Sequence, residues 1–211
     1  MSLSDSRKGL NRNPYICNMD GINDYYMDGL DLSVLRRFFV EEGVPGVWEK
    51  NEWFIRQGDR SPLVAYVAEG MFRFVRTDEA GNEHIVGYSF RDSFVAEYSA
   101  CLCARPALAD VQAIVRSRLY VLPYSKLQDF WERSPEHQRL GRMVAEQMFA
   151  MAYRRLLDGY CCTPEERYVS LMKVYPELKE KRPLKEIASY IGVTPETVSA
   201  IRRKLLKSGK S

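Results

Sequence analysis

The spacing of apolar residues changes its period twice along this chain. After a polar stretch over residues 1–27, to which no function is assigned, apolar residues recur at helical spacing through residues 35–40, and this helix is expected to end at Gly43. Between Trp48 and Pro123, short runs rich in Val, Ile, Phe and Tyr alternate with Gly, Asp and Asn, which predicts antiparallel strands. Beyond Pro123 the helical spacing returns. The pattern therefore predicts an α+β fold with its strands in one contiguous segment.

Several runs in the middle segment are expected to be strands. They are Trp53–Ile55, Leu63–Val67, Met71–Val75, His84–Phe90, Val111–Val115 and Leu119–Leu122. The stretch from Asp78 to Asn82 has the Asp, Gly and Asn residues that a hairpin turn requires. Short strands at this spacing are typical of a sandwich or roll, so we expect an antiparallel β-roll of about 80 residues.

A long helix with an apolar stripe is predicted to follow a short one over Tyr124–Glu132. It starts at Ser134, and its stripe includes Leu140, Val144, Met148 and Met151 at three- and four-residue spacing. A second copy of the chain, packed along the stripe in a two-helix seam, would bury these side chains. Packing against the chain's own β-roll is the alternative. We interpret the four residues as dimerisation residues.

The C-terminal segment reads as further helices joined by tight turns. Thr163-Pro-Glu-Glu166 matches a capping box with Pro at the first helical position. Two short helices follow, separated by Gly192, which suits a left-handed backbone, and by Thr194, which is expected to cap the second of them. Their buried stripes are Leu184, Ile187, Ala188 and Ile191, and then Val198, Ile201 and Leu205. This spacing is typical of a DNA-reading helix-turn-helix.

The charge distribution favours DNA over a merely solvated helix face. From Lys181 to Ser211 there are eight basic residues against two acidic ones, a net charge of +6, whereas the whole chain carries +3. Such a concentration favours phosphate contacts with release of counterions. Glu196 and Ser199 are expected to read bases. The full set of side chains predicted to contact double-stranded DNA is Lys185, Thr194, Glu196, Thr197, Ser199, Arg202, Arg203 and Lys204.

Composition excludes several other classes of protein. The chain has 211 residues, 45% of them hydrophobic, which suffices for more than one module. No apolar run approaches the roughly 20 residues that span a bilayer, and the N-terminus lacks a signal-peptide core, so a cytoplasmic location is expected. The five cysteines lack the paired spacing of a metal site, so we predict reduced thiols and no metal or cofactor. With no catalytic triad and no phosphate-binding glycine loop, an enzyme is not expected.

The order of β-roll, long helix and helix-turn-helix resembles the Crp/Fnr family, the catabolite-activator and fumarate-nitrate-regulator transcription factors of bacteria. The resemblance covers residues 28–207, and its motifs are Phe54-Ile-Arg-Gln-Gly58, Phe94-Val-Ala-Glu-Tyr98, Glu165-Glu-Arg-Tyr168 and Ile187-Ala-Ser-Tyr-Ile-Gly-Val-Thr-Pro-Glu-Thr-Val-Ser199. It implies a homodimer that reads two half-sites of a near-palindrome and contacts RNA polymerase. The implied parts are an extension (1–27), a cyclic-nucleotide-binding-like sensor roll, or double-stranded β-helix (28–132), a dimerisation helix (133–160) and a helix-turn-helix domain (161–211).

The sequence departs from the family where an effector would bind. In members that bind cyclic nucleotides, a Glu accepts from the ribose hydroxyl and an Arg-Ser pair holds the phosphate. Glu97 fits the first role, but the Arg-Ser position falls on Ala107-Leu108, and nearby Arg105 precedes Pro106, which has no N–H. Because the phosphate would lack its charged partner, we expect weak or absent binding of cyclic AMP and an unidentified effector. The candidate effector-binding residues are Glu97, which is alternatively an ordinary solvated carboxylate, Tyr98 and Arg105.

The recognition helix departs from the family too. In the catabolite activator, bases are contacted by an Arg, by the Glu after it, and by a second Arg four residues beyond that Glu. The matching positions here are Pro195, Glu196 and Ala200, so both guanine-reading arginines are absent and a different specificity is expected. The alternative function is a small-molecule-binding module whose basic C-terminal segment contacts a protein or RNA.

Overall fold

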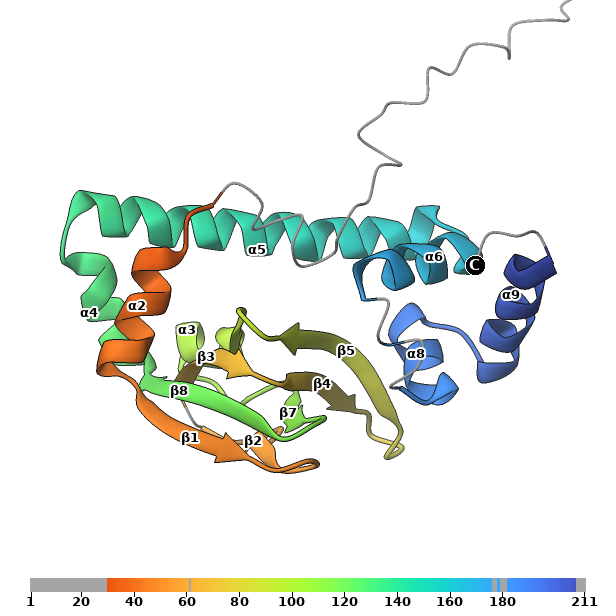
Figure 1. Cartoon of the computed structure of the whole chain (residues 1–211), viewed down its shortest axis with the longest axis horizontal. Helices are drawn as coiled ribbons and strands as arrows, with labels where there is room; N and C mark the ends of the chain where they lie inside the picture. Colours follow the sequence, from red (N-terminus) through yellow and green to blue (C-terminus); the bar gives the residue numbers. More distant parts are fainter. Residues whose placement is uncertain (1–29, 61, 176–177, 179–181, 208–211) are drawn as a thin grey trace, which may run out of the picture.

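A long helix lies along one side of a β-roll and carries a group of shorter helices at its C-terminal end (Figure 1). The computed structural model describes residues 30–60, 62–175, 178 and 182–207, and the expectation for residues 1–27 lies outside them. The long helix, α5, spans Pro135–Cys161. No helix within the described residues is both long and apolar enough to cross a membrane.

Two four-stranded antiparallel sheets form the β-roll. Their orders are β1-β8-β3-β6 and β2-β7-β4-β5. The bounds are β1 Val44–Trp48, β2 Trp53–Ile55, β3 Leu63–Glu69, β4 Met71–Thr77, β5 Glu83–Phe90, β6 Phe94–Ala96, β7 Asp110–Ala113 and β8 Ser117–Pro123. A core of almost fully buried side chains fills the space between the sheets, with Val67, Phe72, Val111 and Leu119 all at 0% exposure.

The predicted strands are confirmed, and two further strands were missed. The hairpin between β4 and β5 turns at Gly81 with φ of 83°, where the N–H of Asp78 donates to the carbonyl of Asn82 at 3.0 Å. Strand β1 contains Pro45, which a sheet tolerates at its edge, and β1 is an edge strand. Strand β6 has only three residues. Pro and Gly, both depleted in strands, explain why β1 was not predicted.

The bounds of the other described helices are α2 Ser33–Glu42, α3 Tyr98–Cys103, α4 Tyr124–Glu132, α6 Pro164–Val174, α8 Leu184–Ile191 and α9 Pro195–Lys207. Helices α3, α5, α6 and α9 begin at a residue whose side chain caps them, whereas α2, α4 and α8 begin without a side-chain cap. Ser134 caps α5 by accepting from the N–H of His137. The capping box of Thr163 and Glu166 at the start of α6 is confirmed, because each side chain accepts from the other residue's N–H. Helix α3, which the sequence did not predict, is a short helix of six residues.

A second core packs α2 and α4 against the sheet that contains β3 and β8. The rings of Phe38 and Phe130 stack at 4.4 Å between centroids. Leu140 and Val144 of α5 pack against the same cluster, which fixes the N-terminal half of α5 on the roll. At these two positions the stripe predicted for dimerisation is therefore partly covered by the chain itself, and their part in a dimer stays a prediction.

A third core joins the roll to the C-terminal helices. Its members from β4 and β5 include Met71, Val75 and Ile85, and they lie in one cluster with Leu171 of α6 and Ile187 of α8. All five side chains are at most 5% exposed. The helix-turn-helix is thus packed against the roll of the same chain as well as being connected to it through α5.

Candidate nucleic-acid interface

Helices α8 and α9 form the predicted helix-turn-helix. Gly192 ends α8 in the left-handed region, with φ of 71° and ψ of 44°, and its N–H donates to the last turn of that helix. Val193 then donates to the carbonyl of Ala188 at 3.0 Å. The Thr194 hydroxyl accepts from the N–H of Thr197 at 3.3 Å and so caps α9. The local turn chemistry therefore holds the two helices together, as the sequence predicted.

One face of α9 points to solvent. The buried residues Val198 and Ile201 define its inner side. Along the opposite side, at spacings of four, three and four residues, the exposed side chains are Glu196, Ala200, Arg203 and Lys207. We call these four residues the outer stripe of α9. Ala200, Arg203, Lys207 and the neighbouring Lys204 line a shallow depression of about 340 Å³.

The structure brings most of the predicted DNA-contacting residues to this side. Glu196 and Arg203 are on the outer stripe, Thr197 and Ser199 flank it half-buried, and Lys185 is exposed on α8. Hydrogen bonds from its own backbone N–H and from Thr194 lower the pKa of Glu196. Its carboxylate is therefore charged at neutral pH and can accept a hydrogen bond from a base.

Two of the predicted phosphate contacts turn toward α6. The Nε of Arg202 donates to the hydroxyl of Tyr168 at 2.9 Å, and its guanidinium lies 5.8 Å from the centre of that ring. A buried aromatic partner thus holds Arg202 in this arrangement, and contact of Arg202 with phosphate stays a prediction. Lys204 forms an ion pair with Glu165 of α6 but remains 69% exposed.

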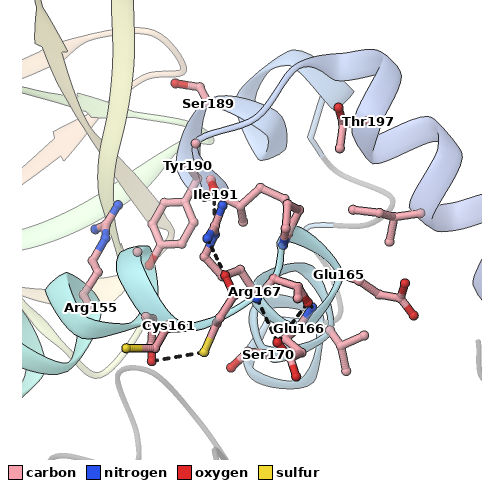
Figure 2. Close-up of a pocket in the computed structure, with 18 of the residues that line it drawn as sticks. Arg155, Cys161, Glu165, Glu166, Arg167, Ser170, Ser189, Tyr190, Ile191 and Thr197 are labelled. Carbon is pink, nitrogen blue, oxygen red and sulfur yellow. Dashed lines mark hydrogen bonds between the residues drawn. The ribbon is translucent and has the colours of Figure 1, made fainter.

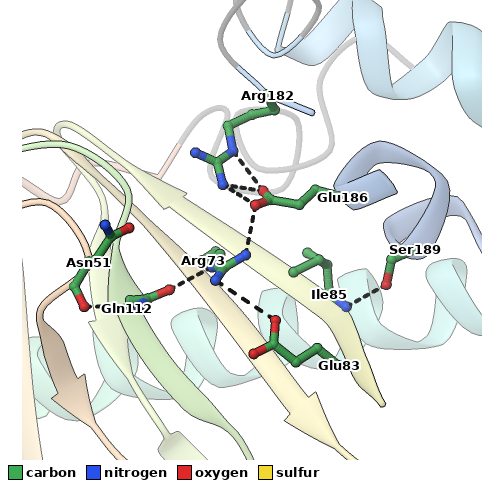
Figure 3. A network of polar contacts seen from close by, with 8 residues as sticks. All are labelled: Asn51, Arg73, Glu83, Ile85, Gln112, Arg182, Glu186 and Ser189. Atoms are coloured by element: carbon green, nitrogen blue, oxygen red, sulfur yellow. Dashed lines mark hydrogen bonds and ion pairs between the residues drawn. The ribbon is translucent and has the colours of Figure 1, made fainter. Parts of the chain in front are cut away.

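A buried group of three charges joins α8 to the roll, as Figure 3 shows. Arg73 of β4 donates to the carboxylate of Glu186 at 2.7 Å, and Arg182 pairs with the same carboxylate. The side chains of Arg73, Glu186 and Arg182 are only 15, 15 and 11% exposed. The Nε of Arg73 also donates to Gln112 at 2.8 Å, and Gln112 in turn donates to the carbonyl of Asn51 at 2.9 Å. We call Arg73, Glu186 and Arg182 the charge triad.

Further contacts hold the same junction. The backbone N–H of Ile85 on β5 donates to the hydroxyl of Ser189 on α8 at 2.8 Å. The rings of Phe90 and Tyr175 stack at 4.0 Å. Burial, and after it the charge of Glu186, raises the pKa of Tyr88, which lies in the same cluster. Polar and aromatic contacts therefore position α8, and with it the outer stripe of α9, relative to the roll.

A cavity of about 1260 Å³ lies beside this junction, lined by residues from β5, α5, α6, α8 and α9 (Figure 2). The guanidinium of Arg155 lies 4.2 Å from the ring centre of Tyr190 on one wall. Burial raises the pKa of Asp158, to which the thiol of Cys162 donates at 3.6 Å. Arg167 donates to the carbonyls of Ile191 and Cys162 at 3.0 and 2.7 Å. The cavity therefore lies between the roll and the C-terminal helices, and the hydrogen bond from Arg167 to Ile191 joins α6 to α8 beside it.

The candidate effector-binding residues do not form a shared polar site. The Glu97 carboxylate accepts from the N–H of Ala100 and from the Ser99 hydroxyl, at 2.9 and 2.8 Å, so it caps α3. The Tyr98 ring packs edge-on against Tyr124 at 5.9 Å. Arg105 is exposed. Glu97 thus has a local structural role that the sequence did not predict.

Helix α5 exposes a different apolar stripe from the one predicted for dimerisation. Met148 and Met151 are half-buried, and Met151 lines the cavity beside the junction. The exposed apolar side chains of α5 are at other positions, between residues 149 and 160. They are Phe149 (71% exposed), Tyr153 (52%), Leu156 (55%), Leu157 (41%) and Tyr160 (83%). We call these five residues the exposed stripe of α5.

The cysteines differ widely in their exposure. Cys101 is buried, and burial together with the Glu97 carboxylate raises the pKa of its thiol to about 11. Cys103 and Cys161 are exposed, and Cys162 is half-buried. Within the part of the chain that the structure describes, no group of three or more His, Cys, Asp or Glu side chains is placed to hold a metal ion.

The chain is similar in sequence to one domain family and to two transcriptional activators of bacteria. The family model for the cyclic nucleotide-binding domain matches residues 46–134. A probable transcriptional activator of Rhizobium leguminosarum bv. viciae is 27% identical over 166 residues, covering 74% of this chain and 68% of the relative. The transcriptional activator protein anr of Pseudomonas aeruginosa is 24% identical over 194 residues, covering 87% of this chain and 75% of the relative.

Solved structures share the fold over most of the chain. FixK2 of Bradyrhizobium japonicum superposes with a TM-score of 0.66 at 20% identity, covering 79% of this chain and 86% of that protein. A transcriptional regulator of the CRP/FNR family from Thermus thermophilus superposes with a TM-score of 0.60 at 20% identity, covering 79% of this chain and 87% of that protein. At this identity the likeness shows the fold alone.

Proposed function

We propose that this chain is a transcription regulator of the Crp/Fnr family, as its similarities support, and that it binds a near-palindromic DNA site as a homodimer through the outer stripe of α9. The observation that carries the proposal is the outer stripe itself. It places a charged Glu196 and the cationic Arg203 and Lys207 on the exposed side of the second helix of a helix-turn-helix. Helices of this kind enter the major groove with their N-terminal residues toward the base edges.

The homodimer is supported by the exposed stripe of α5. Phe149, Tyr153, Leu156 and Tyr160 follow one another at spacings of four, three and four residues, which is the spacing of a two-helix seam. The rings of Phe149 and Tyr153 stack on each other at 5.9 Å between centroids, within the same helix. Large apolar side chains grouped on one exposed face favour a protein partner, and a second α5 offers the same stripe.

The effector remains unidentified. The interior of the roll is filled by side chains, and Glu97, which would meet a ribose hydroxyl, instead caps α3. Weak or absent binding of cyclic AMP therefore stays our prediction. Contact with RNA polymerase also stays a prediction that follows from the family.

Selection of DNA from a random pool tests the proposal. The purified protein is incubated with random duplexes at about physiological salt, and the retained fraction is sequenced. Enrichment of two half-sites about one or two helical turns apart is the expected result, because the spacing of half-sites follows from the symmetry of the dimer. Retention without any preferred sequence would overturn the proposal and favour a protein or RNA partner for the basic segment.

Replacing Arg203 with alanine should weaken binding to all duplexes and make binding less sensitive to salt. Arg203 lies on the outer stripe and is expected to reach phosphate. Log K falls as log salt rises, and each lost phosphate contact makes this fall less steep by about 0.9. A dimer loses one contact per protomer, so the slope should fall by about two units. The measurement is a salt titration of affinity for the selected operator and for random DNA.

The control is Arg91→Ala, which removes a 72% exposed arginine from the roll. A loss confined to the operator would contradict this role.

Replacing Glu196 with alanine should relax the sequence preference at one position of each half-site. Its charged carboxylate can accept from a cytosine amino group, and a good bidentate side-chain contact to a base contributes about 1–3 kcal/mol of discrimination. Repeating the selection with the variant measures the preference at every position. Glu41→Ala, which removes an exposed carboxylate from α2, is the matched control. An unchanged selected sequence would contradict base reading by Glu196.

A further inference from the structure

The centre of the outer stripe of α9 is small and apolar. Ala200 is exposed between Glu196, one turn before it, and Arg203, nearly one turn after it. Ala200 lines the shallow depression together with Arg203, Lys204 and Lys207. A helix that enters a groove with this side therefore presents a methyl group flanked by charged side chains.

We propose that the Ala200 methyl contacts the 5-methyl group of a thymine, so that Ala200 is a specificity-determining residue for thymine in each half-site. The proposal rests on the proposed function, because it requires α9 to lie in the major groove. Thymine is the base whose edge carries a methyl group there, and alanine is among the residues that make apolar contact with it. The charged neighbours can reach past this contact to hydrogen-bonding groups and phosphates.

Helix geometry limits where the thymine lies. Glu196 and Ala200 are four residues apart, which corresponds to about 6 Å along a helix with a rise of about 1.5 Å per residue. Successive base pairs are about 3.4 Å apart. The thymine contacted by Ala200 therefore lies within about two base pairs of the pair contacted by Glu196. A short side chain at position 200 also lets the helix approach the base edges closely, which a long side chain would prevent.

Removal of single thymine methyl groups tests this contact directly. Each thymine in the selected operator is replaced in turn by deoxyuridine, which pairs identically and lacks the methyl group. At one thymine per half-site, affinity should fall about fourfold, as expected for one apolar carbon removed from a buried contact. Ala200→Gly should bind the unmodified operator more weakly and lose its sensitivity to deoxyuridine at that thymine.

Two further variants keep the result interpretable. Ala200→Ser avoids the weakening of the helix by glycine, and it should show reduced sensitivity at the same thymine. Leu206→Ala shortens an apolar side chain of α9 that is 64% exposed and off the outer stripe, and it should retain full sensitivity. A defined operator without a deoxyuridine-sensitive thymine, or sensitivity that persists in Ala200→Gly, overturns the inference alone. Loss of all sequence preference in the unmodified protein overturns the proposed function and this inference with it.

Discussion

Combining Phe149→Glu with Leu156→Glu should convert the protein to a monomer and weaken its binding to a full operator by at least about a hundredfold. Both side chains are more than half exposed on the exposed stripe of α5, so the single chain should fold without them. In a two-helix seam, however, both would be buried, and replacing an anchor residue of an interface costs about 2 kcal/mol or more. The two glutamates of each copy would also face those of the other copy. Since about 1.4 kcal/mol is a factor of ten, the two changes suffice to separate the dimer at working concentrations.

Sedimentation and operator binding measured on the same samples check this expectation. Leu102→Glu is the matched control, because Leu102 is also a large apolar residue, 58% exposed, but belongs to α3 and not to the exposed stripe of α5. The control should keep the mass and affinity of the unmodified protein. A double variant that remains dimeric would place the self-association surface elsewhere. A monomer with undiminished operator affinity would contradict the role of the dimer in DNA binding.

Replacing Glu186 with glutamine should lower the free energy of unfolding by about 2 kcal/mol and shift the thermal midpoint down by about 4–8 °C. Glu186 is the one acidic member of the charge triad, so the change leaves Arg73 and Arg182 close together without its negative charge. Breaking a fully buried ion pair costs about 3–5 kcal/mol. The expected value is smaller because each side chain keeps some exposure to water and Glu83 lies 3.9 Å from Arg73.

The same change should also weaken operator binding, although Glu186 lies off the outer stripe. The charge triad joins α8 to the roll, and a loosened helix-turn-helix must lose more conformational freedom when it binds DNA. Hydrogen exchange at the Ile85 amide, which donates to Ser189, reports whether the junction opens. The amide should exchange faster in the variant.

Two further variants distinguish loss of the charge triad from the general effect of removing one carboxylate. Glu69→Gln breaks a surface pair with Arg118 whose side chains are 58 and 47% exposed, and it should cost less than about 1 kcal/mol. Replacing the whole triad with apolar residues, by Arg73→Met, Arg182→Met and Glu186→Leu together, should restore much of the stability, because no unpaired charge remains. A Glu186→Gln variant no less stable than Glu69→Gln would show that the triad does not hold the junction.

Local features of the fold were predictable because residues near in sequence determine them. Thr163 and Glu166 cap α6 within three residues of each other, and Gly192 ends α8 through its own backbone conformation. The outer stripe of α9 could likewise be predicted from helical spacing once Val198 and Ile201 were taken as buried. Strand β1 was missed because it contains Pro and Gly, which are depleted in strands. Strand β6 was missed although it is as long as β2, which was predicted.

The order of elements, the turn of the helix-turn-helix and the charged face of its second helix follow from local sequence. Tertiary packing sets the partners of the longer side chains. It turned Arg202 onto Tyr168, 34 residues away in sequence, and it paired Arg73 with Glu186 across a separation of 113 residues. It also determined which apolar side chains of α5 pack against the rest of the chain and which stay exposed. Helical periodicity shows that a helix has an apolar side, but when apolar residues extend over much of its circumference, only packing selects the surface that each of them meets.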